Sequence, residues 1–188
     1  MQDYIKTYRH MVTLNDGAHV LLRALTQEDK NALIEFFAPI SREELKFMRN
    51  DVTDRALVSE WVDNLDYTKV LPIIALLNNR IVGNTTIHFH GSGPQRHVAE
   101  VRVFLGKEVR KRGVGTALLH IAIEMARKMG LQQLVVEVVA DQVSVIHAFE
   151  NLGFEKRVVL TDYYMMPDGE THDVIVLILP LIRKKEQF

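Results

Sequence analysis

The residues best suited to chemistry form a short basic segment with two glycines, Arg110-Lys111-Arg112-Gly113-Val114-Gly115. Glycine has no Cβ, so backbone N–H groups near Gly113 and Gly115 can approach a ligand closely. A helix that begins here would present partial positive charge at its N-terminus, where phosphate oxygens bind well. The three cationic side chains add attraction for a polyphosphate. The segment therefore predicts a pyrophosphate-binding loop.

The flanking residues predict the elements that would position this loop. Residues 100–105 alternate between polar and apolar types, which is the pattern of a half-buried strand. After the loop, apolar residues recur at helical spacing as far as Met129, and Gly130 ends the helix. The loop is not a P-loop, because Lys-Ser/Thr does not follow Gly115, and it lacks the third glycine of a dinucleotide fingerprint.

The spacing Arg-x-x-Gly-x-Gly, entered from a strand and followed by a helix, resembles the acyl-CoA loop of the GNAT superfamily of N-acyltransferases. Two other segments strengthen the resemblance. Ala99-Glu100-Val101, about ten residues before Arg110, is similar to a strand sequence of the family, and residues 149–154 resemble its second motif, aromatic-x-x-x-Gly-Phe. The resemblance covers nearly the whole chain, from about Met11 to Leu181.

The order of the predicted elements is also that of the GNAT fold. Apolar periodicity and turn residues predict strands at 11–14, 19–24, 70–77, 81–90, 100–105, 131–140, 156–164 and 172–179, and helices at 26–37, 42–49, 53–64, 114–129 and 142–151. The apolar run 134–139 predicts a strand buried on both faces. We therefore expect one domain over residues 1–188, with its core at about 11–181.

The resemblance implies an α/β (α+β) fold whose mixed, mostly antiparallel sheet is flanked by helices. It implies that the sheet splays between the strands at 100–105 and 131–140, and that acetyl-CoA enters there as cosubstrate. The Leu105 amide would face the thioester carbonyl, where a fixed N–H stabilises the charge that develops during acyl transfer. The residues implied to bind the cofactor are Val103, Phe104, Leu105, Arg110, Lys111, Arg112, Gly113, Val114, Gly115, Thr116 and Phe149.

Acetyl transfer to an amine also requires a base, because a lysine with an ordinary pKa near 10.4 is mostly protonated at pH 7. Glu100 matches the position of a catalytic glutamate in many GNAT enzymes. An alternative interpretation of Glu100 is a strand glutamate in an ion pair with Arg102. Glu137, which lies within an apolar strand, is the alternative base.

The general acid is less clearly marked. The family's second motif commonly has a tyrosine that protonates the departing CoA sulfur, and Phe149 stands at that position here. Ser144, Tyr163 or Tyr164 are the candidates to replace it, with Tyr164 as a weak acid candidate. The expected asparagine early in that helix is also absent, since Asp141-Gln142 occupy its place.

Composition limits the class of protein. A net charge of −1 argues against nucleic-acid binding, and no apolar run reaches the length of a membrane span. The chain has no cysteine, and its first ten residues lack the apolar segment of a signal peptide, so we expect a cytoplasmic protein. His88, His90 and His97 lack a carboxylate at matching spacing, so we expect no metal.

The hypothesis that follows is an acyl-CoA-dependent N-acetyltransferase that moves acetyl by direct attack to a primary amine of a small molecule or a protein lysine. One alternative is a non-catalytic acyl-CoA-binding sensor, favoured by Phe149 and the missing asparagine. Another is a nucleotide-binding protein, which would bind ATP. In the family the last strands of the sheet often pair between copies, so a homodimer is a further hypothesis, which a monomeric mass in solution would remove.

Overall fold

The computed structural model describes residues 2–182, and the charged tail around Arg183-Lys184-Lys185 lies outside the described residues. The strands are β1 (Arg9–Thr13), β2 (His19–Ala24), β3 (Val70–Leu77), β4 (Arg80–Phe89), β5 (Val98–Leu105), β6 (Gln133–Val139), β7 (Glu155–Met165) and β8 (Thr171–Pro180). They form one sheet in the order β1-β2-β3-β4-β5-β6-β8-β7. Every register given for the sheet is antiparallel except that of β5 with β6.

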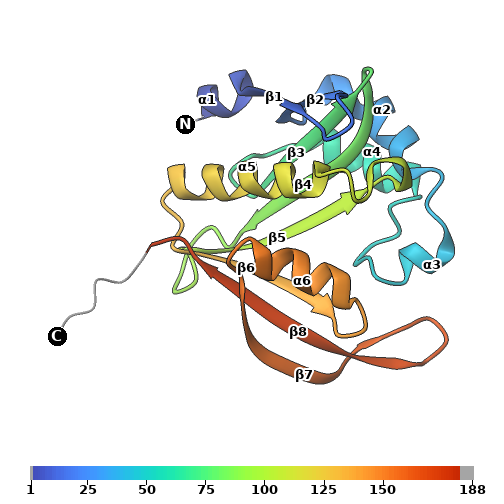
Figure 1. Ribbon diagram of the computed structural model, residues 1–188, viewed down its shortest axis with the longest axis vertical. Coiled ribbons are helices and arrows are strands. Elements are labelled where there is room, and N and C mark those ends of the chain that lie inside the picture. The colour runs from blue at the N-terminus through green and yellow to red at the C-terminus, as the bar shows by residue number, and fades with distance from the viewer. Residues whose placement is uncertain (1, 183–188) are drawn as a thin grey trace. The chain divides into compact units, whose positions relative to one another are not determined.

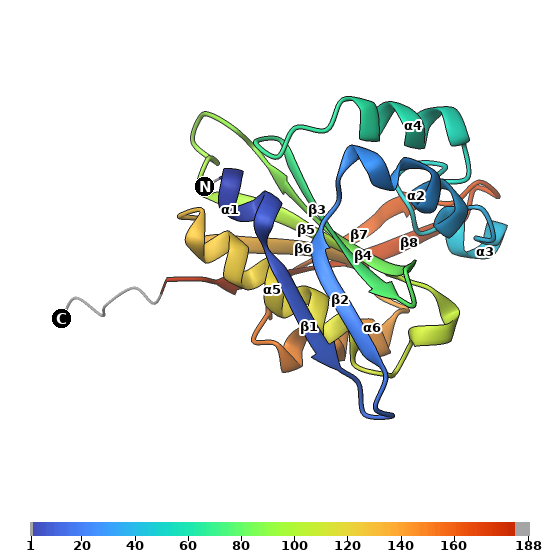
Figure 2. The same cartoon turned by 90° about the horizontal axis from the view of Figure 1, so that it is seen from above.

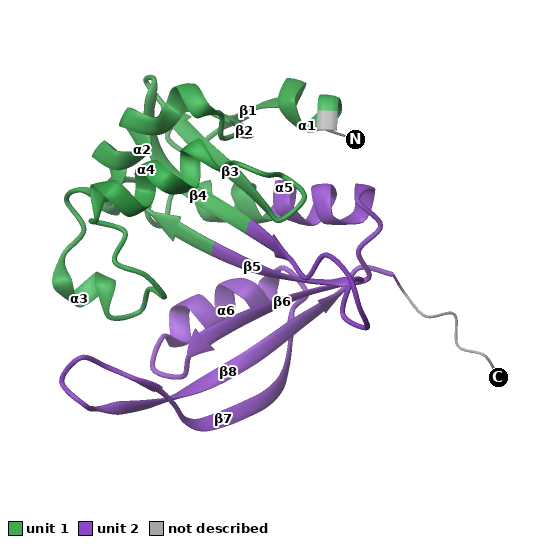
Figure 3. Ribbon diagram, turned by 180° about the vertical axis from the view of Figure 1, so that it is seen from behind, with its two compact units in different colours: residues 1–86, 103–119 green, residues 87–102, 120–188 purple. Residues whose placement is uncertain are grey.

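One helix precedes the first strand, and the others lie between strands along the chain (Figure 1). The α-helices are α1 (Gln2–Thr7), α2 (Lys30–Phe37), α3 (Arg42–Leu45), α4 (Arg55–Asp63), α5 (Val114–Lys128) and α6 (Val143–Asn151). Two short 3-10 helices precede α2 and α5, at Gln27–Asp29 and Lys107–Val109. The chain divides into two compact units (Figure 3), the first with residues 1–86 and 103–119 and the second with residues 87–102 and 120–188. The expectation of a single domain stays a prediction.

The first unit contains an antiparallel ribbon of β1, β2 and β3, with Val20 opposite both Val12 and Leu77. Alternate residues of β2 are buried, so one face of that strand contributes to a core. Helices α2 and α4 lie next to each other (Figure 2), and apolar side chains from both form a core cluster with Ile74 and Ile81. This packing follows from the helical spacing of apolar residues in α2 and α4.

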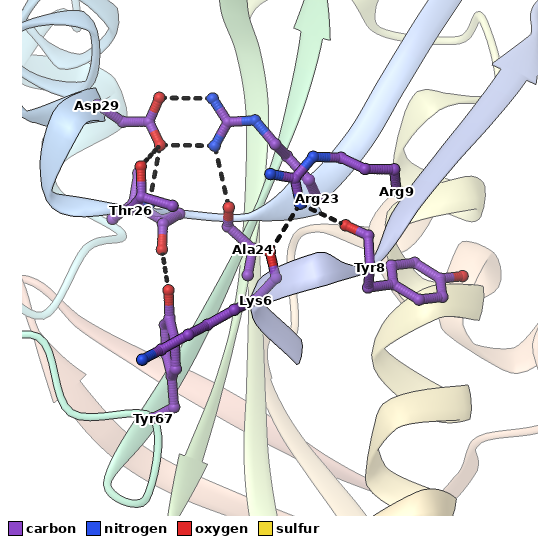
Figure 4. Close-up of polar contacts among 9 residues, drawn as sticks. Lys6, Tyr8, Arg9, Arg23, Ala24, Thr26, Asp29 and Tyr67 are labelled. Atoms are coloured by element: carbon purple, nitrogen blue, oxygen red, sulfur yellow. Dashed lines mark hydrogen bonds and ion pairs between the residues drawn. The ribbon is translucent and has the colours of Figure 1, made fainter. Parts of the chain in front are cut away.

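A network of polar contacts fixes the turn from β2 into α2 (Figure 4). The Arg23 guanidinium donates to both Asp29 carboxylate oxygens at 2.6 Å, and Asp29 accepts from the Thr26 N–H at 2.8 Å. The Tyr67 hydroxyl donates to the Leu25 carbonyl at 2.5 Å. Burial alone would raise the pKa of Asp29, but the hydrogen bonds from Arg23 and Thr26 outweigh it and lower that pKa.

The second unit contains the start of β5 and strands β6, β8 and β7. The parallel register of β5 with β6 joins Val98–Glu100 to Gln133–Val135 and stops at that point, although both strands continue. Strand β6 does not have both faces buried, so that prediction is wrong. Its even-numbered residues from Leu134 to Val138 are buried, whereas Gln133, Val135 and Glu137 are half-exposed.

Most of the predicted elements are confirmed with small shifts at their ends. Two helices differ from the prediction: the helix expected over 42–49 ends at Leu45, and the N-terminal helix α1 was not predicted. Helix α1 is only six residues long, although its Ile5 side chain is buried. A single apolar residue gives too little periodicity to indicate a helix.

Candidate active site

Two residues of the predicted phosphate loop, at positions 110–115, have a left-handed backbone. Lys111 and Gly113 have φ angles of +61° and +91°, in the left-handed region where glycine has no steric cost. Helix α5 then begins at Val114, and the Ala117 N–H donates to the Gly113 carbonyl at 3.0 Å. The first N–H groups of a helix have no partner within it, so those at the start of α5 are free to bind an anion.

Two glycines enclose the side chain of Leu105 at the end of β5. A Cβ on Gly115 would lie 2.9 Å from Leu105 Cδ1, and a Cβ on Gly83 would lie 2.8 Å from Leu105 Cδ2. Neither distance leaves room for a side chain without movement of Leu105. Gly115 therefore allows the first turn of α5 to pack directly against the end of β5. The role expected for the Leu105 amide, at the thioester carbonyl, stays a prediction.

Arg110 connects this strand end to helix α3. Its Nε and Nη2 donate to the Leu105 carbonyl at 3.2 and 3.1 Å, and Nη2 also donates to Glu44 Oε1 at 2.5 Å. Glu44 also accepts from Ser41 in a capping box and lies 3.3 Å from Lys107 Nζ. The hydrogen bond from Arg110 is the largest cause that lowers the pKa of Glu44, from 4.5 to about 2.

The other two cations of the loop differ in their partners. Arg112 forms an ion pair with Asp16 in the loop between β1 and β2 and donates to the Glu108 carbonyl at 3.2 Å. Lys111 is exposed and has no ion pair within residues 2–182. A bound phosphate would compete with carboxylates for Arg110 and Arg112, whereas Lys111 could meet it without such competition.

Glu100, the first candidate base, is in a bidentate ion pair within the second unit. Arg102 Nε and Nη2 donate to its two carboxylate oxygens at 2.8 and 2.9 Å. The two residues are two positions apart on β5 and therefore share one face of the strand. Glu100 is also the last residue of β5 in register with β6. The ion pair agrees with the structural interpretation of Glu100 and leaves its catalytic role a proposal.

Two other candidates, Glu137 and Tyr164, lie together. The Tyr164 hydroxyl donates to Glu137 Oε2 at 2.9 Å, although the two residues are 27 positions apart. A bulge precedes Tyr164. The four-residue step from 160 to 164 in β7 lies opposite a two-residue step from 174 to 172 in the antiparallel strand β8. Asp162 lies within the bulge with φ of +51°, and its N–H donates to Asp173 Oδ1 at 3.0 Å. The structure thus joins the alternative base to one of the candidate acids.

A comparison with known protein families gives the identity of the fold. The model of the acetyltransferase (GNAT) family matches residues 21–154 of this chain, which is well over half of it. The chain belongs to the acetyltransferase (GNAT) family. The match includes the loop at residues 110–115, Glu100 and Glu137, and it ends at Phe154.

GNAT relatives of known name support this assignment. The [ribosomal protein bS18]-alanine N-acetyltransferase of Escherichia coli is 34% identical over 74 residues, which cover 39% of this chain and 49% of that protein. The chain thus spans about half the length of that relative. N-alpha-acetyltransferase 30 of Dictyostelium discoideum is 27% identical over 134 residues, which cover 69% of this chain and 64% of that protein.

Solved GNAT structures share the fold. A GNAT-family acetyltransferase from Streptococcus pneumoniae gives a TM-score of 0.75 at 21% identity and covers 86% of this chain and 99% of its own. YncA from Salmonella typhimurium, solved with its cofactor acetyl-CoA, gives a TM-score of 0.75 at 18% identity and covers 90% of this chain and 98% of its own. At such identities the likeness establishes the fold.

The departure from the GNAT second motif has a structural counterpart. Phe149 is buried and packs edge-on against Phe154, with ring centroids 5.1 Å apart. The Phe149 side chain fills a core position in α6, and this packing does not favour contact with acyl-CoA. That contact stays a prediction. Among the other candidate acids, Ser144 and Tyr163 are exposed. Val103, Phe104 and Thr116 lie at the strand end and at the start of α5, as expected.

Within residues 2–182, no group of three or more His, Cys, Asp or Glu side chains is arranged to hold a metal ion. No helix of the described chain is long and apolar enough to span a membrane.

Sequence reasoning missed the carboxylates that bind the loop arginines. Neighbouring residues explain the capping box of Ser41 and Glu44, but nothing local indicates that Glu44 also binds Arg110. The same is true of Asp16, whose ion pair with Arg112 joins residues 96 positions apart. Pairs so distant in sequence become visible only in the fold.

Proposed function

We propose that this protein is an N-acetyltransferase that uses acetyl-CoA to acetylate a primary amine. The observation that carries the proposal is the loop at 110–115 with left-handed Lys111 and Gly113 at the N-terminus of α5, in a chain of the GNAT family. The same loop offers the donor phosphates an exposed cation, Lys111.

In this proposal the chain's own groups bind and orient the donor. Acetyl-CoA supplies an activated thioester. The N–H groups of Gly113, Val114 and Gly115 bind its pyrophosphate, because helix N-termini favour anions. The Leu105 N–H lies near the thioester oxygen and stabilises the negative charge that develops there. Arg110 holds the Leu105 carbonyl and so restrains the peptide plane that follows this donor.

The acceptor amine must lose a proton, and two groups can receive it. Glu100 is the first choice, as a base that accepts the proton directly or through water while Arg102 orients its carboxylate. Glu137 is the second choice. The Tyr164 hydroxyl donates to Glu137, so a proton that leaves the amine through Tyr164 can pass to Glu137. The departing thiolate has a pKa near 8.5, so it requires little assistance from an acid.

The acceptor that we favour is an N-terminal α-amino group. The E. coli relative is named for an alanine of a ribosomal protein, and the Dictyostelium relative is named an N-alpha-acetyltransferase. An α-amino group with a pKa near 8 is about 10% neutral at pH 7, whereas a lysine with a pKa near 10.4 is only about 0.04% neutral. Because Glu100 is already in an ion pair with Arg102, it is better suited to take a proton from an α-amino group, which has the lower pKa, than from a lysine.

The test is acetyl-CoA-dependent thiol release, followed against alanine-terminated peptides, N-terminally blocked lysine peptides and small amines. The variant is Glu100→Gln. Its matched control is Glu155→Gln, because Glu155 forms a similar pair with Arg157, two positions along strand β7. We expect release with a free α-amino group, a loss of about 100-fold in kcat/KM for Glu100→Gln at pH 7, and no loss for the control.

Each result decides between named alternatives. Acetyl-CoA binding without release for any acceptor would refute the enzyme and favour the acyl-CoA sensor. Full activity of Glu100→Gln would transfer the role of base to Glu137 and Tyr164. Preference for lysine peptides would refute the α-amino assignment while leaving the reaction in place.

A further inference from the structure

Outside the proposed donor site, one side-chain atom of residues 2–182 is both buried and unsatisfied. The side-chain oxygen of Asn84 in β4 is buried and has no hydrogen-bond partner within residues 2–182. The residue as a whole is half-buried. A buried carbonyl without a partner is costly, so this atom calls for an explanation.

The neighbouring strand shows which face of the sheet Asn84 occupies. The Gly106 N–H donates to the Val82 carbonyl at 2.8 Å, and a Cβ on Gly83 would meet Leu105 and the Leu118 side chain of α5. Successive residues of a strand point to opposite faces. Asn84 therefore lies on the face opposite α5, and Phe104, which precedes Leu105 on β5, lies on that same face.

Aromatic side chains line this second face. The ring of Phe104 lies 5.6 Å from that of Phe36 and 6.2 Å from that of Phe37, measured between centroids. Phe37 is buried in the core of the first unit, whereas Phe36 and Phe104 are half-exposed. The polar acceptor atom of Asn84 thus lies on a face with partly exposed rings.

We propose that Asn84, Phe104 and Phe36 bind the acceptor substrate, a primary amine attached to an apolar group. The Asn84 oxygen accepts a hydrogen bond from an N–H of this substrate, and the rings contact its apolar part. The proposal rests on the proposed acetyl transfer. It is consistent with that reaction because Phe104 adjoins Leu105, whose N–H is assigned to the thioester oxygen.

The ligand chemistry separates this site from the phosphate loop. A phosphate has no N–H group and at neutral pH mainly accepts hydrogen bonds, so a carbonyl oxygen without a partner is a poor partner for it. An amine, an ammonium or a peptide N–H is a good partner. A free alkylamine and the N-terminus of an apolar peptide share this chemistry, so hexylamine and a peptide that begins Ala-Leu are the two probes.

The kinetic experiment compares wild type with Asn84→Leu, which keeps the volume and removes the polar atoms. Asn31→Leu is the matched control, because Asn31 is exposed on α2. We expect Asn84→Leu to raise the KM of the better probe about tenfold and to leave the KM of acetyl-CoA within twofold. Removal of an unsatisfied polar atom should not lower the midpoint of urea unfolding. An unchanged acceptor KM, or equal changes in both KM values, would overturn the assignment.

A second measurement does not depend on turnover. The side-chain amide signal of Asn84 is assigned in the nitrogen-15 NMR spectrum by its loss in Asn84→Leu, and the CoA-bound protein is then titrated with hexylamine and with the peptide. We expect this signal to shift with one probe or both. Saturation without a shift, or no binding of either probe, would refute the site. Absence of thiol release in wild type, together with a shift of Asn84, would refute acetyl transfer and not the site.

Discussion

The ion pair between Glu44 and Arg110 gives the prediction that can be worked out most fully. The perturbation is Glu44→Gln, which removes one negative charge and little else. Glutamine at this position can still reach back to the Ser41 N–H, so the capping box of α3 is kept. The change therefore isolates the ionic contacts of Glu44 with Arg110 and Lys107.

The magnitude follows from the pKa of Glu44. A pKa lowered from 4.5 to about 2 corresponds to at most about 3.4 kcal/mol, at 1.36 kcal/mol for each pKa unit. The Arg110 and Lys107 side chains are 42% and 67% exposed, so solvent screens much of this interaction. We therefore expect Glu44→Gln to lower the free energy of unfolding by about 1–2 kcal/mol at pH 7.

The contribution of Glu44 to the free energy of unfolding should decrease as the pH falls. Because the pKa of Glu44 is lower in the folded chain than in the unfolded chain, its contribution is fully present above pH 4.5. It is lost as the pH falls toward 2. The difference between wild type and Glu44→Gln should therefore be constant from pH 6 to 7 and shrink to less than half at pH 3.

The assay is urea unfolding followed by far-ultraviolet circular dichroism, with an unchanged m-value as a check on two-state behaviour. The matched control is Glu43→Gln on the same helix, because the Glu43 side chain is 80% exposed and pairs only weakly with Lys46 at 3.3 Å. The control should change stability by less than about 0.5 kcal/mol. Equal effects of the two variants, or a Glu44→Gln effect that does not depend on pH, would refute the reasoning.

Two further predictions concern other polar pairs. Asp29→Asn breaks the bidentate pair with Arg23 and should lower the free energy of unfolding by about 3 kcal/mol at pH 7. Because the pKa of Asp29 is lowered by folding, this loss should decrease below pH 3.8 in urea titrations, and a loss that grows on acidification would contradict it. Tyr164→Phe should lower kcat by about 10- to 100-fold if the hydroxyl paired with Glu137 transfers a proton, with Tyr163→Phe as the exposed control. Equal rates for the two tyrosine variants would exclude that role.

Features set by short stretches of sequence were predictable. The Thr26 and Ser41 capping boxes, the turn at Asn78-Asn79 with its positive φ angles, and the left-handed Gly153 after α6 each depend on residues close together in sequence. The start of α5 belongs to this group, because Gly113 and the first residues of the helix are consecutive in sequence. These features depend on backbone and side-chain chemistry within a few residues.

Features set by contacts between distant residues were not predictable. Glu44 and Arg110 are 66 positions apart, and Glu137 and Tyr164 are 27 positions apart. The bulge around Asp162 changes which side chains of β7 share a face, and alternation of residue types alone does not reveal such a shift. The burial of β6 was predicted wrongly because an apolar run gives no information about what covers each face.

The central claim is that CoA binds at the N-terminus of α5, and the most direct test is a titration of nitrogen-15-labelled protein with CoA. The amide signals of Gly113, Val114 and Gly115 should show the largest shifts, while those of β1, which has no assigned role in binding, should remain in place. An Arg112→Ala variant would test this claim less directly than the titration, because the substitution would also remove the ion pair between Arg112 and Asp16. Saturable binding with shifts confined to other segments, or no binding at all, would contradict the account.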